Sequence, residues 1–338
     1  MRKITNKFGS VIIVAVLSLA TIGSAGTRIS DTKPADDRAL GPLWNPVTDM
    51  SSLDLLDGPG GQKDQPLGPY VFLKEDLKGT NPKIDVRDAN GIEWKAKFGL
   101  EARPETAASR LIWAGGYFTS EEYYLPTLHI DNLPAHLHRG NEFVTSDGSG
   151  TNARLKRLPG MKKIGNWRWK ENPFINTREL NGLKVMMALI NNWDLKDVNN
   201  AVFENEDATE KIYMVSDLGA SFGSGRWSRP LTKAKGNLQA YTRSKFIING
   251  SSDYLNFALA PHPALIRAAV LPLYAKYVDM EWIGKNIPRS DAIWIGRLLA
   301  QLSPNQIKDA FRAAGYSTEE VEGFSEVILG RIAELNNL

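Results

Sequence analysis

Residues 191–200 have the sequence Asn191-Asn192-Trp193-Asp194-Leu195-Lys196-Asp197-Val198-Asn199-Asn200, and Ser216-Asp217-Leu218-Gly219 follows them. The first segment carries a carboxylate at Asp194, a lysine two residues later and an asparagine five residues later. The second carries Asp217 at the end of an apolar run, just before a glycine. A carboxylate can orient a hydroxyl nucleophile, a lysine can neutralise charge on a transferred group, and Asp and Asn oxygens are ligands that Mg²⁺ accepts. The two segments together predict a metal-dependent phosphoryl-transfer site.

Each segment also has a purely structural explanation, in which Asp194 caps a turn and Asn199 belongs to a surface turn. Either segment alone favours that explanation. The functional interpretation is favoured because the two segments occur in this order at short range, with a predicted strand over 211–216 between them. A helix predicted over 179–190 precedes Asp194, so both carboxylates are expected at the ends of rigid elements.

The gross composition is that of a globular protein. The chain has 338 residues, 42% of them hydrophobic and 23% charged, which is enough for one large two-part domain. The formal charge is only +3, and the one basic concentration, over 154–170, is interpreted as a solvated loop. A nucleic-acid partner is therefore not expected. There is no cysteine, and so no disulfide.

Residues 1–25 have the three parts of a signal peptide: positive residues, a short apolar run and small residues for cleavage (Arg2, Lys3 and Lys7; 11–22; 23–25). The apolar run is too short for a comfortable membrane span. We expect a periplasmic or secreted protein. The alternative is an uncleaved signal that anchors the chain, in which case only this segment contacts the membrane.

Strand patterns dominate the next part of the chain. Short strands are predicted over 70–73, 84–87, 92–98 and 123–126, with a hairpin turn over 88–91 and a helix over 104–115. Within 92–98, period-two alternation places Trp94, Ala96 and Phe98 on one face and Lys95 and Lys97 on the other.

Helix patterns dominate the end of the chain. Residues 128–175 show little periodicity and are predicted to be irregular. Residues beyond 243 are predicted to be mostly helical, with helix start signals at Ser303-Pro304 and Ser317-Thr318. We therefore expect an α+β chain in four parts: a signal peptide at 1–25, an extended lead-in at 26–63, a small β-rich lobe with one helix at 64–127, and a mainly helical lobe at 128–338.

The two opening segments resemble those of kinases. Residues 194–199 resemble the catalytic loop of protein kinases from its aspartate onward, and residues 216–223 resemble the Asp-x-Gly segment of the secreted Fam20-type kinases and the type II phosphatidylinositol 4-kinases. Residues 79–83 (Gly-Thr-Asn-Pro-Lys) resemble the Gly-x-x-Pro-Lys loop of HipA-type kinases. The resemblance covers roughly residues 68–260. It implies an exported bacterial member of an atypical branch, with the bilobal protein-kinase-like fold.

The resemblance implies an ATP- and Mg²⁺-dependent phosphotransferase. Asp194 would be the catalytic base, and Lys196 would neutralise charge on the transferred group. Asn199 and Asp217 would be the metal ligands.

The same resemblance assigns residues that hold the nucleotide. Lys97 would hold the α- and β-phosphates and Glu105 would orient it, with Lys95 and Glu101 as the respective alternatives. The glycine turn would contribute two further phosphate contacts (Gly79 and Lys83).

Some positions depart from the kinase pattern. Asn192 and Trp193 stand where protein kinases have His-Arg, Leu218 replaces the usual phenylalanine, and no Ala-Pro-Glu follows. Regulation by activation-loop phosphorylation is therefore not expected. The acceptor is left open among protein, lipid, sugar and small molecule, and nucleotidyl transfer is also open. The alternative to an enzyme is a non-catalytic, pseudokinase-like binding or scaffold protein of the cell envelope.

Two other groups of residues have weaker functional interpretations. His129, His136 and His138 could bind a transition metal if Asp131 or Glu142 completed the site, but incidental surface histidines are favoured. The tryptophans at 167 and 169 could stack on a sugar or base, but ordinary packing is favoured.

Overall fold

The structure, a computed structural model, describes residues 42–77, 81–157, 160–224, 235–259 and 280–338. The described residues belong to one compact unit, Ala39–Leu338. The predicted signal peptide therefore lies outside the described residues. None of the described helices is both long enough and apolar enough to cross a membrane.

Five strands close into a barrel in the order β1-β2-β3-β5-β4. They are β1 (Tyr70–Glu75), β2 (Lys83–Arg87), β3 (Glu93–Phe98), β4 (Glu122–Asp131) and β5 (Ser149–Arg157). Trp94, Ala96 and Phe98 are fully buried in the barrel core, which confirms that they share one face of β3. Lys97 therefore projects from the opposite, outer face, because successive strand residues alternate.

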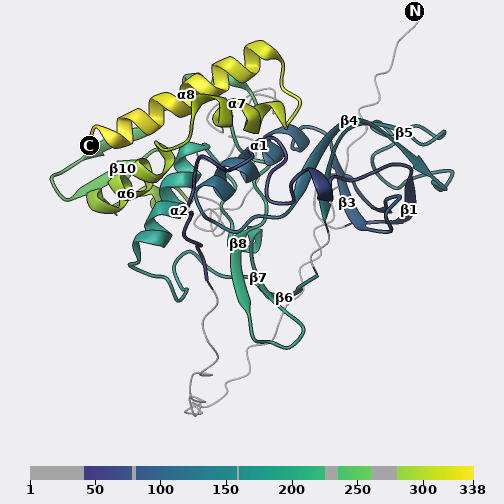
Figure 1. The fold of residues 1–338 in the computed structure, drawn as a ribbon, viewed down its shortest axis with the longest axis horizontal. Helices are drawn as coiled ribbons and strands as arrows, with labels where there is room; N and C mark the ends of the chain where they lie inside the picture. The colour runs from purple at the N-terminus through teal and green to yellow at the C-terminus, as the bar shows by residue number, and fades with distance from the viewer. Residues whose placement is uncertain (1–41, 78–80, 158–159, 225–234, 260–279) are drawn as a thin grey trace, which may run out of the picture. The chain divides into compact units, whose positions relative to one another are not determined.

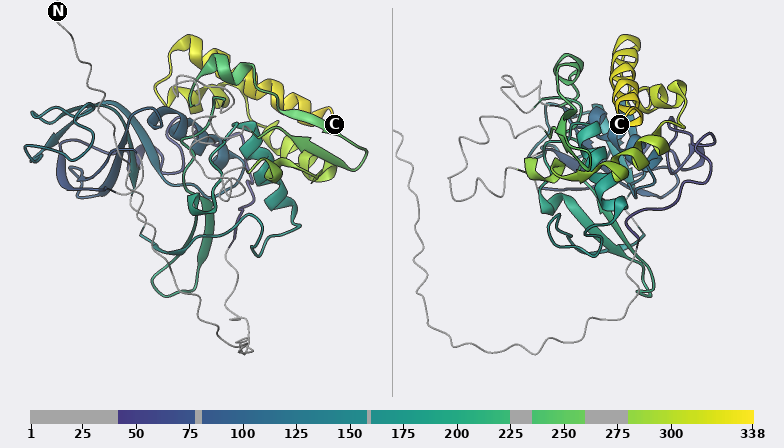
Figure 2. Two further views of the ribbon diagram at one scale, coloured as in Figure 1. Left: turned by 180° about the vertical axis from the view of Figure 1, so that it is seen from behind. Right: turned by 90° about the vertical axis from the view of Figure 1, so that its left-hand side faces the viewer.

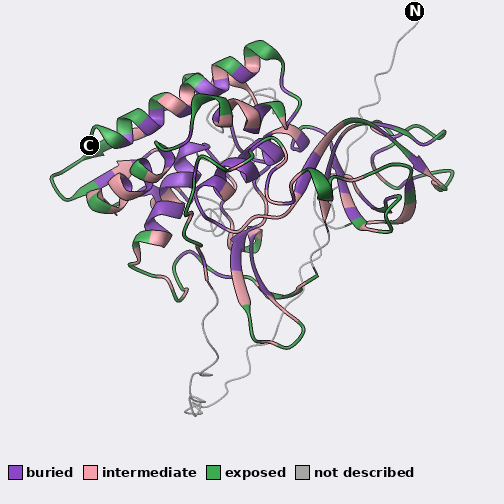
Figure 3. Cartoon of the chain, viewed as in Figure 1, coloured by how far each residue is buried: buried purple, intermediate pink, exposed green. Residues whose placement is uncertain are grey.

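Helix α1 (Ala102–Ala114) packs against β4, β5 and the later helix α7. Figures 1 and 2 both show it between the barrel and the helices of the C-terminal part. Almost every residue of α1 is buried, including Glu105 and Arg110. Figure 3 shows this as a mainly purple helix. The helix begins two residues before the predicted Pro104, which a first helical turn accommodates because it needs no backbone donor there.

The prediction that residues 128–175 are irregular is wrong. Strand β4 continues to Asp131, β5 occupies Ser149–Arg157, and β6 (Lys162–Gly165) follows. Leu128 and His129 pair with Gly150 and Ser149. Such pairing supplies backbone hydrogen bonds between distant residues, which local periodicity does not reveal. Because β5 completes the barrel, the strand-rich part extends to Arg157, and the predicted boundary at residue 127 falls inside β4.

The remaining elements form the C-terminal part. They are α2 (Arg178–Leu189), β7 (Asn200–Glu204), β8 (Lys211–Val215), α3 (Leu238–Thr242), β9 (Ile247–Gly250), β10 (Tyr254–Phe257), β11 (Ile287–Pro288), α6 (Arg289–Leu299), α7 (Pro304–Arg312) and α8 (Thr318–Asn336), with 3-10 turns at Asp197–Asn199 and Glu281–Gly284. A further 3-10 turn, Gln62–Asp64, precedes β1. Strands β6, β7 and β8 form one three-stranded sheet and β9, β10 and β11 another.

The helical prediction beyond residue 243 holds for α6, α7 and α8 and misses β9–β11. Capping boxes at Ser303 and Ser317 begin α7 and α8, as the serines predict. The predicted α+β arrangement, with strands first and mainly helices later, is confirmed.

The described part of the lead-in has little regular structure but is packed against the core. Leu43, Met50 and Leu55 are buried with residues of α1 and α2. Trp44 Nε1 donates to the Gly115 carbonyl at 2.8 Å, so the lead-in caps the end of α1.

Candidate functional site

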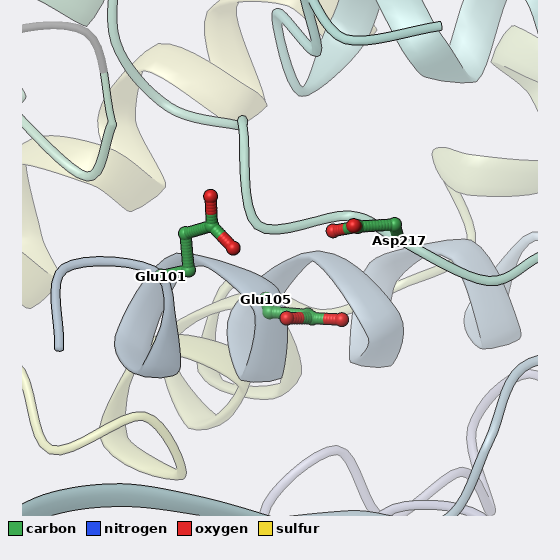
Figure 4. Close-up of side chains that lie close together, drawn as sticks. All are labelled: Glu101, Glu105 and Asp217. Carbon is green, nitrogen blue, oxygen red and sulfur yellow. The ribbon is translucent and has the colours of Figure 1, made fainter. Parts of the chain in front are cut away.

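Lys97 on β3 lies among three carboxylates. Its Nζ is 3.0 Å from Glu105 Oε2 and 3.5 Å from Asp217 Oδ1, and it also forms an ion pair with Glu101. Figure 4 shows Glu101 and Glu105 at the start of α1 and Asp217 on a loop that passes beside it. One oxygen from each carboxylate lies within 4.8 Å of the others. The Lys97 ammonium contacts all three carboxylates.

A glycine allows the Asp217 loop to approach α1. A Cβ added at Gly219 would lie 2.7 Å from Glu101 Cβ, closer than two carbon atoms can pack. The glycine of the Asp-x-Gly segment is therefore required by close passage of the chain against Glu101.

Burial and charge act in opposite directions on the pKa values here. Burial alone would lower the pKa of Lys97, but Glu105, Asp217 and Glu101 together raise it above its ordinary value. Burial would raise the pKa of Glu101, but Lys97 and Lys235 lower it to about 2. Complete burial raises the pKa of Glu105 in spite of its cationic neighbours. Lys97 and Glu101 are thus firmly charged at neutral pH.

Sequence reasoning missed Arg154 and Glu122. Arg154 lies opposite Lys97 on β5, and its guanidinium is 3.3 Å from Glu105 Oε2 and 2.7 Å from Glu122 Oε1. The side chains of Arg154, Glu122, Glu105 and Lys97 are all buried. A signal was present, because Ala153 and Leu155 alternate with charged residues, but the segment was predicted to be irregular.

Sequence reasoning also missed Lys235. Its Nζ forms an ion pair with Glu101 and lies 5.5 Å from the centre of the Trp193 ring. It therefore connects the start of α1 with the residue that precedes Asp194.

The Asp194 loop is held by contacts within itself. Asn192 Oδ1 accepts from the Asp194 backbone N–H at 3.0 Å, and Lys196 Nζ is 2.9 Å from Asp194 Oδ1. Asn199 Nδ2 donates to the Asp194 carbonyl at 2.6 Å. The three residues predicted for this loop are thus in mutual contact.

Backbone hydrogen bonds align this loop with the Asp217 segment. Phe222 N–H donates to the Ile190 carbonyl at 2.8 Å, Trp193 N–H to the Ala220 carbonyl at 3.3 Å, and Ser216 N–H to the Asn199 carbonyl at 2.8 Å. These bonds flank Asp194 in the first segment and Asp217 in the second. The two segments that sequence analysis singled out therefore lie side by side.

The other predicted phosphate-binding residues are placed differently. Lys95 pairs with Asp76 at 2.8 Å and Asp85 at 2.5 Å, so the contacts with Asp217 and Glu105 belong to Lys97. Lys83 lies opposite Lys97 on β2 and is 3.7 Å from Asp76. Gly79 lies outside the described residues.

Histidines 129 and 138 each have a carboxylate neighbour, Asp131 at 3.3 Å and Glu75 at 3.1 Å respectively. Within the part of the chain that the structure describes, no histidine belongs to a group that could hold a metal ion. Trp167 and Trp169 are buried against each other edge to face, which supports ordinary packing.

The oxygens of Glu101, Glu105 and Asp217 that lie close together already contact the Lys97 ammonium, and Asp217 and Asn199 are the predicted ligands of a divalent cation. The Asp217 side chain is 43% exposed. Asn199 uses its amide nitrogen for Asp194, and across the described ranges its Oδ1 accepts no hydrogen bond. A carboxylate and an amide oxygen on adjacent segments are ligands of the kind that Mg²⁺ accepts, since Mg²⁺ commonly binds through one or two protein oxygens and keeps its other ligands as water or phosphate.

No protein-family model matches the sequence, and no curated protein matches it. Among solved structures, the chain is similar to the proinflammatory kinase CtkA of Helicobacter pylori, with a TM-score of 0.46 and 11% identity over 79% of this chain and 95% of that one. It is also similar to the Golgi casein kinase, with a TM-score of 0.32 and 11% identity over 80% of this chain and 75% of that one. Both are kinases, the class that the sequence motifs resemble. Because both TM-scores are below 0.5, the functional assignment rests on the site itself.

Proposed function

We propose that the protein is an atypical kinase, an ATP- and Mg²⁺-dependent phosphotransferase with a bilobal protein-kinase-like fold. The observation that carries this proposal is the position of Lys97, which contacts Glu105 on α1 and Asp217, 120 residues further along the chain. A strand lysine, a helix glutamate and the aspartate of Asp-x-Gly are the three residues that such a site must join. The barrel with α1 would be the small lobe, and the residues from β6 onward the large lobe.

Each residue has a definite task in this mechanism. Asp194 accepts the proton of the acceptor hydroxyl as its oxygen bonds to the γ-phosphorus and ADP leaves. Lys196, 2.9 Å from Asp194, stabilises the charge that develops on the transferred group. Lys97 binds the α- and β-phosphates, and Glu105 orients it. Asn199 and Asp217 would hold Mg²⁺, which when bound would neutralise phosphate charge.

Thermal melting tests this proposal directly. ATP with Mg²⁺ is expected to raise the melting temperature of the wild type, and ATP alone to raise it less. Asp217→Asn should lose the metal-dependent part of the shift. Asp194→Asn should keep the shift and lose phosphate transfer by at least about 100-fold. A wild type whose melting temperature does not change with ATP and Mg²⁺ contradicts the proposal that the protein is a phosphotransferase.

A pseudokinase-like scaffold of the cell envelope is the second candidate, and one contact favours it. Glu101 contacts the Lys97 ammonium in addition to Glu105 and Asp217. The phosphates of ATP must therefore compete with three carboxylates for that ammonium. ATP is also scarce outside the cytoplasm, where the predicted signal peptide would send the chain. Nucleotide binding without turnover on protein, lipid or small-molecule acceptors would favour the scaffold.

Two measurements settle the finer points. ATP labelled at the α- or the γ-phosphate distinguishes nucleotidyl from phosphoryl transfer by which label reaches the acceptor. Fractionation of cells, followed by sequencing of the mature N-terminus, distinguishes a periplasmic or secreted protein from one anchored by an uncleaved signal.

A further inference from the structure

Ser216, the residue before Asp217, is bound from both parts of the protein. Its backbone N–H and its hydroxyl both donate to the Asn199 carbonyl, at 2.8 and 3.0 Å. Its own carbonyl accepts from Lys156 Nζ at 3.3 Å. Ser216 therefore joins strand β5 of the barrel to Asn199 and, through the chain, to Asp217. Asn199 and Asp217 are the Mg²⁺ ligands in the proposed function.

Within the described residues, Lys156 has few other contacts that would explain its position. It lies opposite Glu122 on β4 and Lys95 on β3. Its Nζ is 4.0 Å from Glu122 Oε1, an oxygen that Arg154 already binds at 2.7 Å. Lys156 is largely buried, with 16% of its side chain exposed, and burial lowers its pKa. An ammonium in such a place costs free energy unless its donors are used.

We propose that Lys156 is a positioning residue for the metal site, acting through Ser216 on Asn199 and Asp217. This inference rests on the proposed function. The ammonium fixes the Ser216 carbonyl, the peptide before Asp217 is then held in one orientation, and the Ser216 N–H and hydroxyl hold Asn199 beside it. Loss of Lys156 leaves the side chains of Asn199 and Asp217 unchanged but makes their positions less ordered. Outer partners of metal ligands commonly change metal affinity by roughly 10- to 100-fold.

The experiment is a Mg²⁺ titration of the ATP-induced melting shift in the full chain. Lys156→Met is expected to raise the Mg²⁺ concentration for the half-maximal shift roughly 10- to 100-fold. Its affinity for ATP without metal should stay within about threefold of the wild type, because Lys156 acts on the ligands. Lys156→Arg, which keeps a charged donor, should restore most of the Mg²⁺ response. Lys163→Met, at an exposed position on β6, is the matched control and should behave as the wild type.

Ser216→Ala tests the second half of the link, from Ser216 to Asn199, without altering the barrel. Ser216→Ala removes one of the two bonds to the Asn199 carbonyl, so the Mg²⁺ midpoint should rise roughly 3- to 10-fold. If Lys156→Met does not fold, Lys156→Gln takes its place in the titration. Wild-type midpoints in the folded variants overturn the role of Lys156 while the proposed function stands. No Mg²⁺-dependent shift in the wild type overturns the proposed function instead. Equal weakening of metal-free and metal-dependent ATP binding in Lys156→Met also overturns the role, since it indicates a direct nucleotide contact.

Discussion

The cluster around Lys97 and the loop around Asp194 are organised by different forces. Lys97 is held by ion pairs between residues from three separate segments, and its side chain is only 7% exposed. Asp194, Lys196 and Asn199 contact one another within six residues, and Lys196 is 41% exposed. The first group is rigid because unpaired buried charges are costly, and the second because short-range hydrogen bonds fold one loop. The two regions should therefore respond differently to mutation.

The largest effect on stability is expected for Lys97→Met. It removes the cation from between Glu101, Glu105 and Asp217, and leaving buried carboxylates without that partner costs about 3–5 kcal/mol. Urea unfolding measures the loss, and ATP binding should disappear with it. Lys95→Met is the matched control, because Lys95 leaves the same strand face toward Asp76 and Asp85, and it should retain ATP binding. A Lys97→Met variant that is as stable as the wild type and binds ATP would show that ion pairs do not organise the cluster around Lys97.

A pH-dependent effect is expected at Glu101. Its pKa is lowered to about 2 from an ordinary 4.5, so the ionised form stabilises the fold. That contribution is complete above about pH 4.5 and is lost as the pH falls toward 2, with a size on the order of 3 kcal/mol. Glu101→Gln should lack it. The difference in unfolding free energy between wild type and variant should shrink across this window, and a difference that does not change with pH would show that the ion pairs contribute nothing.

A smaller loss is expected for Gly219→Ala, which places a Cβ 2.7 Å from Glu101 Cβ. Overpacking of this kind costs about 1–3 kcal/mol. Gly165→Ala is the control, because a Cβ there meets nothing within 4 Å. Equal melting temperatures for the two variants would mean that the Asp217 loop can move away from α1 freely.

The smallest effect on stability is expected for Lys196→Met. The pair with Asp194 is partly exposed, so its loss should cost less than about 1 kcal/mol. Phosphate transfer should nevertheless fall roughly 100-fold, since a charge-stabilising group is removed. Turnover at the wild-type rate would exclude Lys196 from the reaction and leave it as a solvent-facing partner of Asp194.

The sequence predicted much of the fold where the signals were local. The alternation of Trp94, Ala96 and Phe98 gave the buried face of β3, and the serines at 303 and 317 gave the starts of α7 and α8. It failed over 128–175, where β4 and β5 pair across a connection of 17 residues between Asp131 and Ser149. Pairing of that kind depends on the partner strand, which local periodicity does not contain.

The site shows the same distinction between local contacts and contacts that join distant parts of the sequence. The sequence by itself predicted the Asp194 loop, since the contacts among Asp194, Lys196 and Asn199 lie within six residues. The Asp-x-Gly segment was recognisable as a motif, but its position depends on long-range contacts with Asn199, Glu101 and Lys97. Only the tertiary structure decided which cations and anions meet there: Lys97 with Glu101 as well as Glu105, Arg154 behind them, Lys156 on Ser216, and Lys235 on Glu101 from 134 residues away. The physical reason is that a buried charge is satisfied by whichever opposite charge the packed chain brings to it, and spacing along the sequence does not fix that partner.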